Sequence, residues 1–283
     1  MVEQFISIYG DAAAQTPFNS DQLVVEISAT HLVTWVKQAA GKEKVVAFEW
    51  FTFDATLHSW YDIFFTVRSM SKILDRGYID TRVFFQFPET VLIPADKFSE
   101  EAAAIFVNAM HGDSVTDVIK TDLLQLPEPM YNAYKISKQL NDMVNGNMMM
   151  VSARHTHSTI VEYLLQPGKP MRSLVAKLQF YKRFFTLTIV QNNRLLLVQS
   201  YEFNSPEDVL YYLINATKQF NLVTDHMQVE LSGAIDTKGW LFEHLKKVFT
   251  NIVFDKVPST ESLPAAFAEY PDYYFTPFFN VLP

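Results

Sequence analysis

Short runs of apolar residues form two groups along the chain. The first group has three runs within residues 23–53, and the second has three within residues 174–203. The runs are rich in valine, isoleucine, leucine and phenylalanine and are too short for typical helices, which favours strands. Asn192 and Asn193 join the last two runs of the second group and indicate a tight hairpin turn. Each group therefore predicts three consecutive strands.

Segments with helical spacing of apolar residues follow both groups, at 57–74 and 205–220. The second segment has Ser205 as a candidate N-cap and Pro206 at the first helical position, which is a strong helix start. A further strand and a further helix come next in each half of the chain. The order strand, strand, strand, helix, strand, helix thus occurs twice, near 23–110 and 174–249. The last strand and helix of the first copy are at 81–87 and 99–110, and those of the second copy are at 228–235 and 238–249.

The pattern between the two copies is less regular. Met148, Met149 and Met150 predict a buried strand within 147–153, because methionine fills irregular cores. The segment 167–170 contains two prolines and a glycine and should stop the preceding helix. We expect an N-terminal domain of residues 1–172 and a C-terminal domain of residues 173–283. The other elements predicted in this region are strands at 89–94 and 130–136 and helices at 138–146 and 157–166.

This order of elements predicts an α/β protein with mixed sheets. Two units of three strands, a helix, a strand and a helix are the layout of the duplicated actin-like, ribonuclease-H-like fold. A single larger α+β domain fits the same pattern and stays open as the alternative.

Composition limits the function classes. Of the 283 residues 49% are hydrophobic and 19% are charged, which is typical of a globular protein with a sizeable core. The net charge of −8 argues against nucleic-acid binding, which needs clustered lysine and arginine. The chain has no cysteine, so disulfides, cysteine-bound zinc and cysteine nucleophiles are excluded. Without a signal-peptide pattern or an apolar run near 20 residues, the sequence predicts a soluble cytoplasmic protein with no transmembrane segment.

Four stretches resemble one family of uncharacterised bacterial proteins, domain-of-unknown-function family 3822. The most specific is EFNSPEDVLYYLINATKQFNL at 202–222, and VLIPADKF at 91–98, LSGAID at 231–236 and PDYYFTPFFNVL at 271–282 are also similar. The resemblance implies an actin-like ATPase fold related to pilus-assembly and secretion-platform proteins. It implies no established activity.

Active members of the actin-like superfamily place an acid and a glycine in each of two hairpins and a Gly-Gly turn at the adenosine. Carboxylates bind hydrated Mg²⁺, and glycine lets backbone N–H groups approach phosphate closely. Under the resemblance, the corresponding positions here are Glu26 and Ser28 in the first hairpin, Lys177 and Gln179 in the second, and Ser232 and Gly233 at the adenosine turn.

These positions match the requirements poorly. Ser28 supplies no glycine, and Lys177 would oppose Mg²⁺, although it could pair with a bare phosphate. Gly233 fits the adenosine turn, but Ala234 replaces the second glycine. We therefore expect a non-catalytic binding or scaffold module with a degenerate nucleotide site and no cofactor. The alternative is a divergent ATPase or phosphotransferase that binds Mg-ATP through Glu26 and Gly233.

Two other features are candidates for function. His155 and His157 have a spacing that suits metal binding, but no third ligand is near in sequence, so we expect no metal site. The aromatic C-terminal segment should pack back on its own domain, and the sharper hypothesis is that it docks a protein partner or a second subunit. The residues that would carry this docking are Tyr273, Tyr274, Phe275, Phe278 and Phe279.

Overall fold

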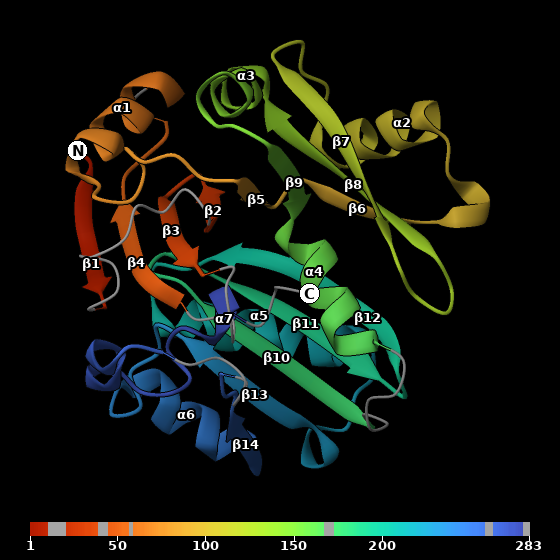
Figure 1. Cartoon of the computed structure of the whole chain (residues 1–283). Helices are drawn as coiled ribbons and strands as arrows, with labels where there is room; N and C mark the ends of the chain where they lie inside the picture. Colours follow the sequence, from red (N-terminus) through yellow and green to blue (C-terminus); the bar gives the residue numbers. More distant parts are fainter. Residues whose placement is uncertain (11–20, 39–44, 57–58, 167–172, 258–262, 280–283) are drawn as a thin grey trace. The chain divides into compact units, whose positions relative to one another are not determined.

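The computed structural model describes residues 1–10, 21–38, 45–56, 59–166, 173–257 and 263–279 (Figure 1). The chain divides into two compact units, Met1–Ser158 with Ser259–Glu269 and Thr159–Pro258 with Tyr270–Pro283. This division falls within the helix α4 (Thr156–Leu165). The domain boundary between residues 172 and 173 stays a prediction, and the segment 167–170 lies outside the described residues.

The main sheet of the first unit has six strands among the residues that the structure describes. They are β1 (Glu3–Tyr9), β2 (Gln22–Ser28), β3 (His31–Lys37), β4 (Val45–Thr52), β5 (Asp80–Gln86) and β9 (Val151–His155). Their spatial order is β1-β4-β3-β2-β5-β9. β2, β3 and β4 run antiparallel in succession, whereas β5 is parallel to β2 and β9 is parallel to β5.

In the described part of the second unit, the sheet repeats this arrangement with five strands. They are β10 (Leu174–Phe180), β11 (Phe184–Gln191), β12 (Arg194–Glu202), β13 (Gln228–Gly233) and β14 (Asn251–Phe254). Their order is β12-β11-β10-β13-β14, again with three antiparallel strands followed by two parallel ones. The predicted recurrence of three strands, a helix and a strand is therefore confirmed in both units.

Helices cover one face of each sheet. In the first unit α1 (Trp60–Met70) packs against α3 (Lys138–Asn147), and in the second unit α5 (Pro206–Gln219) packs against α6 (Trp240–Val248), as Figure 1 shows. The predicted cap of α5 is confirmed, because Ser205 and Asp208 form a capping box. Alternate residues of the strands form the two cores with these helices.

A smaller three-stranded sheet is inserted between β5 and β9. It has the order β6-β8-β7, and the helix α2 packs on it. The prediction that the helix at 99–110 belongs to the first repeat is wrong. The corresponding place is held by α3, which precedes β9 as α6 precedes β14. The bounds are β6 (Thr90–Pro94), α2 (Glu100–His111), β7 (Asp117–Leu124) and β8 (Met130–Ser137).

The methionine run is not a strand. Met149 and Met150 are 75% and 72% exposed, and Met150 has a positive φ of 52°. The backbone N–H of Met148 ends α3 by donating to the carbonyl of Val144, so the three methionines form the turn into β9. The apolar character of methionine misled the prediction, because its flexible side chain is tolerated in a loop as well as in a core. The remaining short helices are η3 (Ala95–Lys97), η4 (Thr224–His226), η5 (Ala265–Glu269) and α7 (Thr276–Phe279).

Candidate functional site

The first hairpin, between β2 and β3, is closed by its own side chains. Glu26 is fully buried, and its Oε1 lies 3.0 Å from Nε2 of His31 at the start of β3. Ser28 ends β2, and its Oγ accepts hydrogen bonds from the backbone N–H groups of Thr30 and His31 at 3.1 and 3.0 Å. The side chain of Ser28, the residue predicted to stand in place of the glycine of a phosphate-binding hairpin, therefore binds backbone N–H groups.

Lys177 of β10 lies in a buried cluster of charges. Its Nζ donates to Oε1 of Glu230 at 2.7 Å and to Oδ2 of Asp255. Glu230 lies directly beside Lys177 on the neighbouring parallel strand, and Asp255 follows β14. Burial opposes the charge of Lys177, but the two carboxylates outweigh burial and raise its pKa. The ammonium group is thus held by two acids of its own unit.

The second hairpin, between β10 and β11, is packed with aromatic rings. Tyr181 stacks on Phe184 with 4.5 Å between the ring centroids, and both side chains are buried. Phe278 of the C-terminal segment meets Tyr181 edge to face at 5.7 Å. Gln179 is also buried, at 3% exposure, near the end of β10. Bulky aromatic side chains therefore fill this turn.

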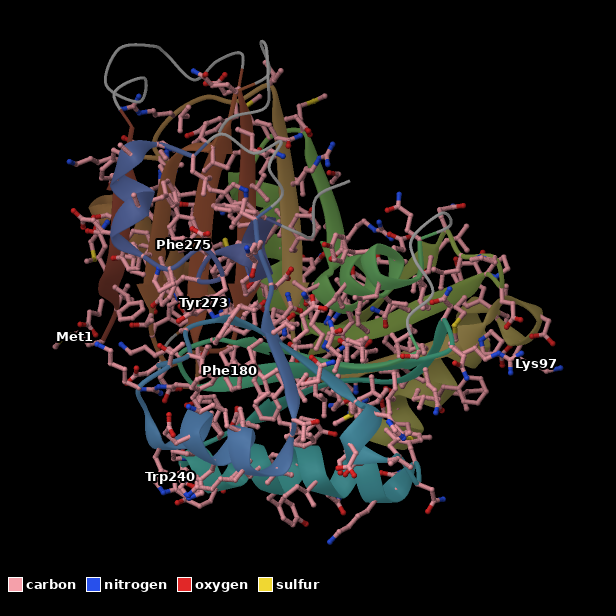
Figure 2. All side chains as sticks on the ribbon, turned by 90° about the horizontal axis from the view of Figure 1, so that it is seen from below. Met1, Lys97, Phe180, Trp240, Tyr273 and Phe275 are labelled. Atoms are coloured by element: carbon pink, nitrogen blue, oxygen red, sulfur yellow. The ribbon has the colours of Figure 1, made fainter. Side chains whose placement is uncertain are left out.

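Gly233 ends β13 in a turn that only glycine suits. Its φ is +86°, and a Cβ atom there would lie 2.0 Å from the carbonyl oxygen of Phe180. The N–H of Ala234 donates to that same oxygen at 2.9 Å, and the N–H of Gly233 donates to the carbonyl of Tyr273 at 2.9 Å. Ser232 is buried, and its Oγ lies 3.4 Å from the carbonyl of Leu178. Figure 2 labels Phe180 and Tyr273, the two residues whose carbonyl groups meet this turn.

The aromatic C-terminal segment packs on the second unit. The ring of Tyr273 stacks on Phe254 of β14 at 4.4 Å, and α7 contacts β13. Phe275, Phe278 and Phe279 are at most 2% exposed. Tyr274 is partly buried, and its ring lies 5.1 Å from that of Phe275. This packing agrees with the expectation that the segment folds back, and its role in partner docking stays a prediction.

A buried polar cluster in the first unit escaped the sequence analysis. Oδ2 of Asp122 on β7 accepts the N–H of His155 at 2.7 Å and the hydroxyl of Ser158 at 2.6 Å. Asn132 donates to the same serine at 2.9 Å. Burial raises the pKa of Asp122 and lowers the pKa of His155 to about 3. The signal was hidden because Asp122 is 33 and 36 residues from His155 and Ser158 in sequence.

The neighbouring His157 completes this cluster. Its backbone N–H donates to Nδ1 of His155 at 3.1 Å, so the two predicted histidines lie together. Burial also lowers the pKa of His157. Nε2 of His155 lies 2.9 Å from the carbonyl of Phe87, which fixes the neutral ring at the junction of β9 and α4. In the part of the chain that the structure describes, no three histidine, aspartate or glutamate side chains are placed to hold a metal ion.

A surface pocket of about 570 Å³ lies in the first unit, at the N-terminal ends of α1 and α3. Trp60 and Tyr61 supply aromatic surface, Val115 and Thr116 border it before β7, and Lys138 and Asp142 contribute charges from α3. The pocket is held together locally, because Oε1 of Gln139 accepts the N–H of Trp60 at 2.9 Å. None of the residues predicted for nucleotide binding lines it.

No helix in the described ranges is long and apolar enough to cross a membrane.

Comparisons with known proteins agree with this architecture. A search of curated protein sequences finds no match. A Bacteroides thetaiotaomicron protein with an actin-like ATPase fold and unknown function is similar in structure, with a TM-score of 0.73 and 18% identity over 84% of this chain and 91% of that one. The PilM-PilN type IV pilus biogenesis complex is also similar, with a TM-score of 0.61 and 12% identity over 94% of this chain and 100% of that one.

These likenesses show the fold and confirm the duplicated actin-like layout predicted from the order of elements. The DUF3822 family, described as a protein of unknown function, matches residues 14–252. The predicted resemblance is thereby confirmed over most of the chain: this protein belongs to the DUF3822 family and has an actin-like ATPase fold.

Proposed function

We propose that this chain is a non-catalytic binding module in which the nucleotide site of the fold has degenerated. The observation that carries the proposal is the position of Lys177 between Glu230 and Asp255. A lysine that is already held by two buried carboxylates has no free charge to offer a phosphate.

The turn at Gly233 supports the same proposal. An adenosine turn needs glycine so that the ligand can lie against the backbone. At Gly233 the positive φ and the close carbonyl of Phe180 already require glycine, and Tyr273 already accepts the N–H group. The residue type is thus explained by the contacts of β13 and β10 alone.

The alternative, a divergent Mg-ATP-dependent ATPase or phosphotransferase, needs Glu26 as a ligand for hydrated Mg²⁺. The carboxylate of Glu26 is buried and 3.0 Å from the ring of His31. Freeing it would break this contact. The residues present therefore fit Mg-ATP poorly, and we derive no reaction step from them.

We propose that the binding partner of this module is another protein. One of the similar folds forms part of the PilM-PilN complex, which gives a precedent for a fold of this kind in a protein assembly. The net charge of −8 argues against nucleic acid as the partner. The cytoplasmic location stays part of this proposal.

Thermal unfolding with and without Mg-ATP tests the proposal. A ligand at 100 times its dissociation constant adds about 2.7 kcal/mol to the free energy of unfolding. The control for ionic effects is Mg²⁺ with inorganic phosphate. We expect the midpoint of thermal unfolding in millimolar Mg-ATP to equal the midpoint in this control. A rise of several degrees with ATP alone would contradict the proposal.

A further inference from the structure

Two strands of the inserted sheet hold the point where β9 leads into α4 (Figure 1). Oγ of Ser158, in the first turn of α4, donates to Oδ2 of Asp122 on β7 at 2.6 Å. Nδ2 of Asn132 on β8 donates to the same Oγ at 2.9 Å. The backbone N–H of His155, which ends β9, donates to Oδ2 of Asp122 at 2.7 Å. The inserted sheet is therefore joined through side chains to the start of α4.

These residues form one buried network, which we call the junction cluster: Asp122, Asn132, His155, His157 and Ser158. Asp122 is 7% exposed, and the other four residues are fully buried. A buried donor or acceptor that loses its partner keeps the full cost of its desolvation, so such a network is stable only while its members stay paired. A change in the protonation of one member therefore acts on the whole cluster.

The hydrogen bonds of His155 fix its ring in one neutral form. Nε2 lies 2.9 Å from the carbonyl oxygen of Phe87, which can only accept, so Nε2 carries the proton. Nδ1 accepts the backbone N–H of His157 at 3.1 Å. The N–H of Phe87 is farther from Nε2, at 3.4 Å, and does not change this assignment. A second proton on Nδ1 would face the N–H of His157, so the closed cluster has no place for it.

The surrounding groups also keep both histidines neutral. The ring of His157 meets that of His155 edge to face at 4.7 Å, and Tyr134 packs on His155 at 4.9 Å. Burial lowers the pKa of both histidines. Burial raises the pKa of Asp122, and the positive charge of Arg154 partly offsets this rise. When the cluster opens, the two histidines take up protons below about pH 6.5, and Asp122 returns at most one.

The inserted sheet can stay folded when the cluster opens, because it has a core of its own. Its buried apolar residues, which α2 covers, are Ile93, Ala103, Val107 and Ala133. Tyr134 and Ile136 of β8 belong to the main core instead. A local opening must break the cluster and the contacts of these two side chains, but not the core under α2. Elements with separate cores can open as cooperative units.

We propose that the junction cluster is an acid-sensitive link, which holds the inserted sheet on β9 and α4 and releases it locally on acidification while the main sheet stays folded. The driving force is the uptake of protons by His155 and His157, which the closed cluster excludes. The inference goes beyond the proposed function, because no residue of the cluster belongs to the predicted nucleotide site.

Hydrogen–deuterium exchange of the full chain, resolved by mass spectrometry, tests this proposal at pH 7 and pH 5. The measured quantity is the protection factor, in which the intrinsic pH dependence of exchange cancels. We expect β7 and β8 to have smaller protection factors than β2 and β5 at both pH values. The protection of β7 and β8 should fall about ten-fold or more between pH 7 and pH 5, since opening takes up at least one net proton.

His155→Gln retains a donor and an acceptor without a titrating group, and it should reduce this fall by about ten-fold. His226→Gln, an exposed histidine in η4 of the other unit, is the matched control and should leave the fall unchanged. The proposal is overturned if β7 and β8 share the protection factors of β2 and β5, since the unit then opens only as a whole. Protection that does not change with pH, or a wild-type fall in His155→Gln, would also overturn it.

Discussion

The backbone N–H of Gly233 donates a hydrogen bond to the carbonyl oxygen of Tyr273 at 2.9 Å. The C-terminal segment thus binds the turn predicted to correspond to the adenosine turn of an actin-like nucleotide site. The same segment places Phe278 against Tyr181 at the second hairpin. One stretch of the chain therefore contacts two of the three elements predicted for such a site.

Replacing Gly233 by alanine should destabilise the protein by more than 2 kcal/mol. The added Cβ would lie 2.0 Å from the carbonyl oxygen of Phe180, and the positive φ adds about 1–2 kcal/mol of strain. Chemical denaturation measures the free energy of unfolding. Gly112→Ala, with a φ of +81° but no atom within 4 Å, should show only the strain. Gly146→Ala in α3 should be neutral or stabilising. Equal stability of all three variants would contradict the geometry at Gly233.

Replacing Lys177 by methionine should destabilise the protein by about 3–5 kcal/mol, because it removes the ammonium group that pairs with two buried carboxylates. Urea denaturation at neutral pH gives the difference. Lys246→Met is the control, since Lys246 pairs with Glu243 on the surface of α6, and it should change stability by less than about 1 kcal/mol. If the Lys177 variant were as stable as the control, the buried cluster would not exist as described.

Stability should fall as the pH falls from about 7 towards 3. The folded state holds His155 neutral because burial lowers its pKa to about 3, whereas the unfolded chain takes up a proton near pH 6.5. The unfolded state then binds more protons, and at pH 5 this costs about 2 kcal/mol. The lowered pKa of His157 acts in the same direction, and the raised pKa of Asp122 opposes it at lower pH.

His155→Gln separates this effect from general acid denaturation. The amide retains donor and acceptor groups at a similar place but does not titrate. The loss of unfolding free energy between pH 7 and pH 5 should shrink by about 2 kcal/mol relative to the wild type. An unchanged loss would show that His155 does not contribute through its proton.

Phe278→Ala should destabilise the protein by about 3–5 kcal/mol, because the ring is 1% exposed. Phe65→Ala in α1, at 52% exposure, is the matched control and should cost far less. Thermal unfolding compares the two. Equal midpoints would contradict the packing of the C-terminal segment and favour a segment free to dock a partner.

Much of the fold was predictable because the repeated elements have strong local signals. The strand runs of β2–β4 and β10–β12 are strongly apolar, and α5 has its cap in the sequence. β1 and β7 were missed because polar residues interrupt short apolar stretches in both. The helix α2 was predicted, but its place on the inserted sheet depends on tertiary packing that periodicity does not encode.

The site was predictable only where its determinants are local. The tight turn at Gly233 follows from the sequence Leu-Ser-Gly, but its hydrogen bond to Tyr273 joins residues far apart in the chain. Likewise, the sequence suggests that Lys177 opposes Mg²⁺, but its partners Glu230 and Asp255 lie 53 and 78 residues away. Contacts at such separations depend on the register of parallel strands, which the sequence does not specify.

Direct titration of Mg-ATP into the intact protein, followed by calorimetry, tests the central claim that this actin-like fold has lost nucleotide binding. Gly233 variants are unsuitable as controls because they disturb the turn itself. The account predicts heats no larger than those of dilution up to millimolar nucleotide. A saturable heat with one ATP bound per chain would contradict it.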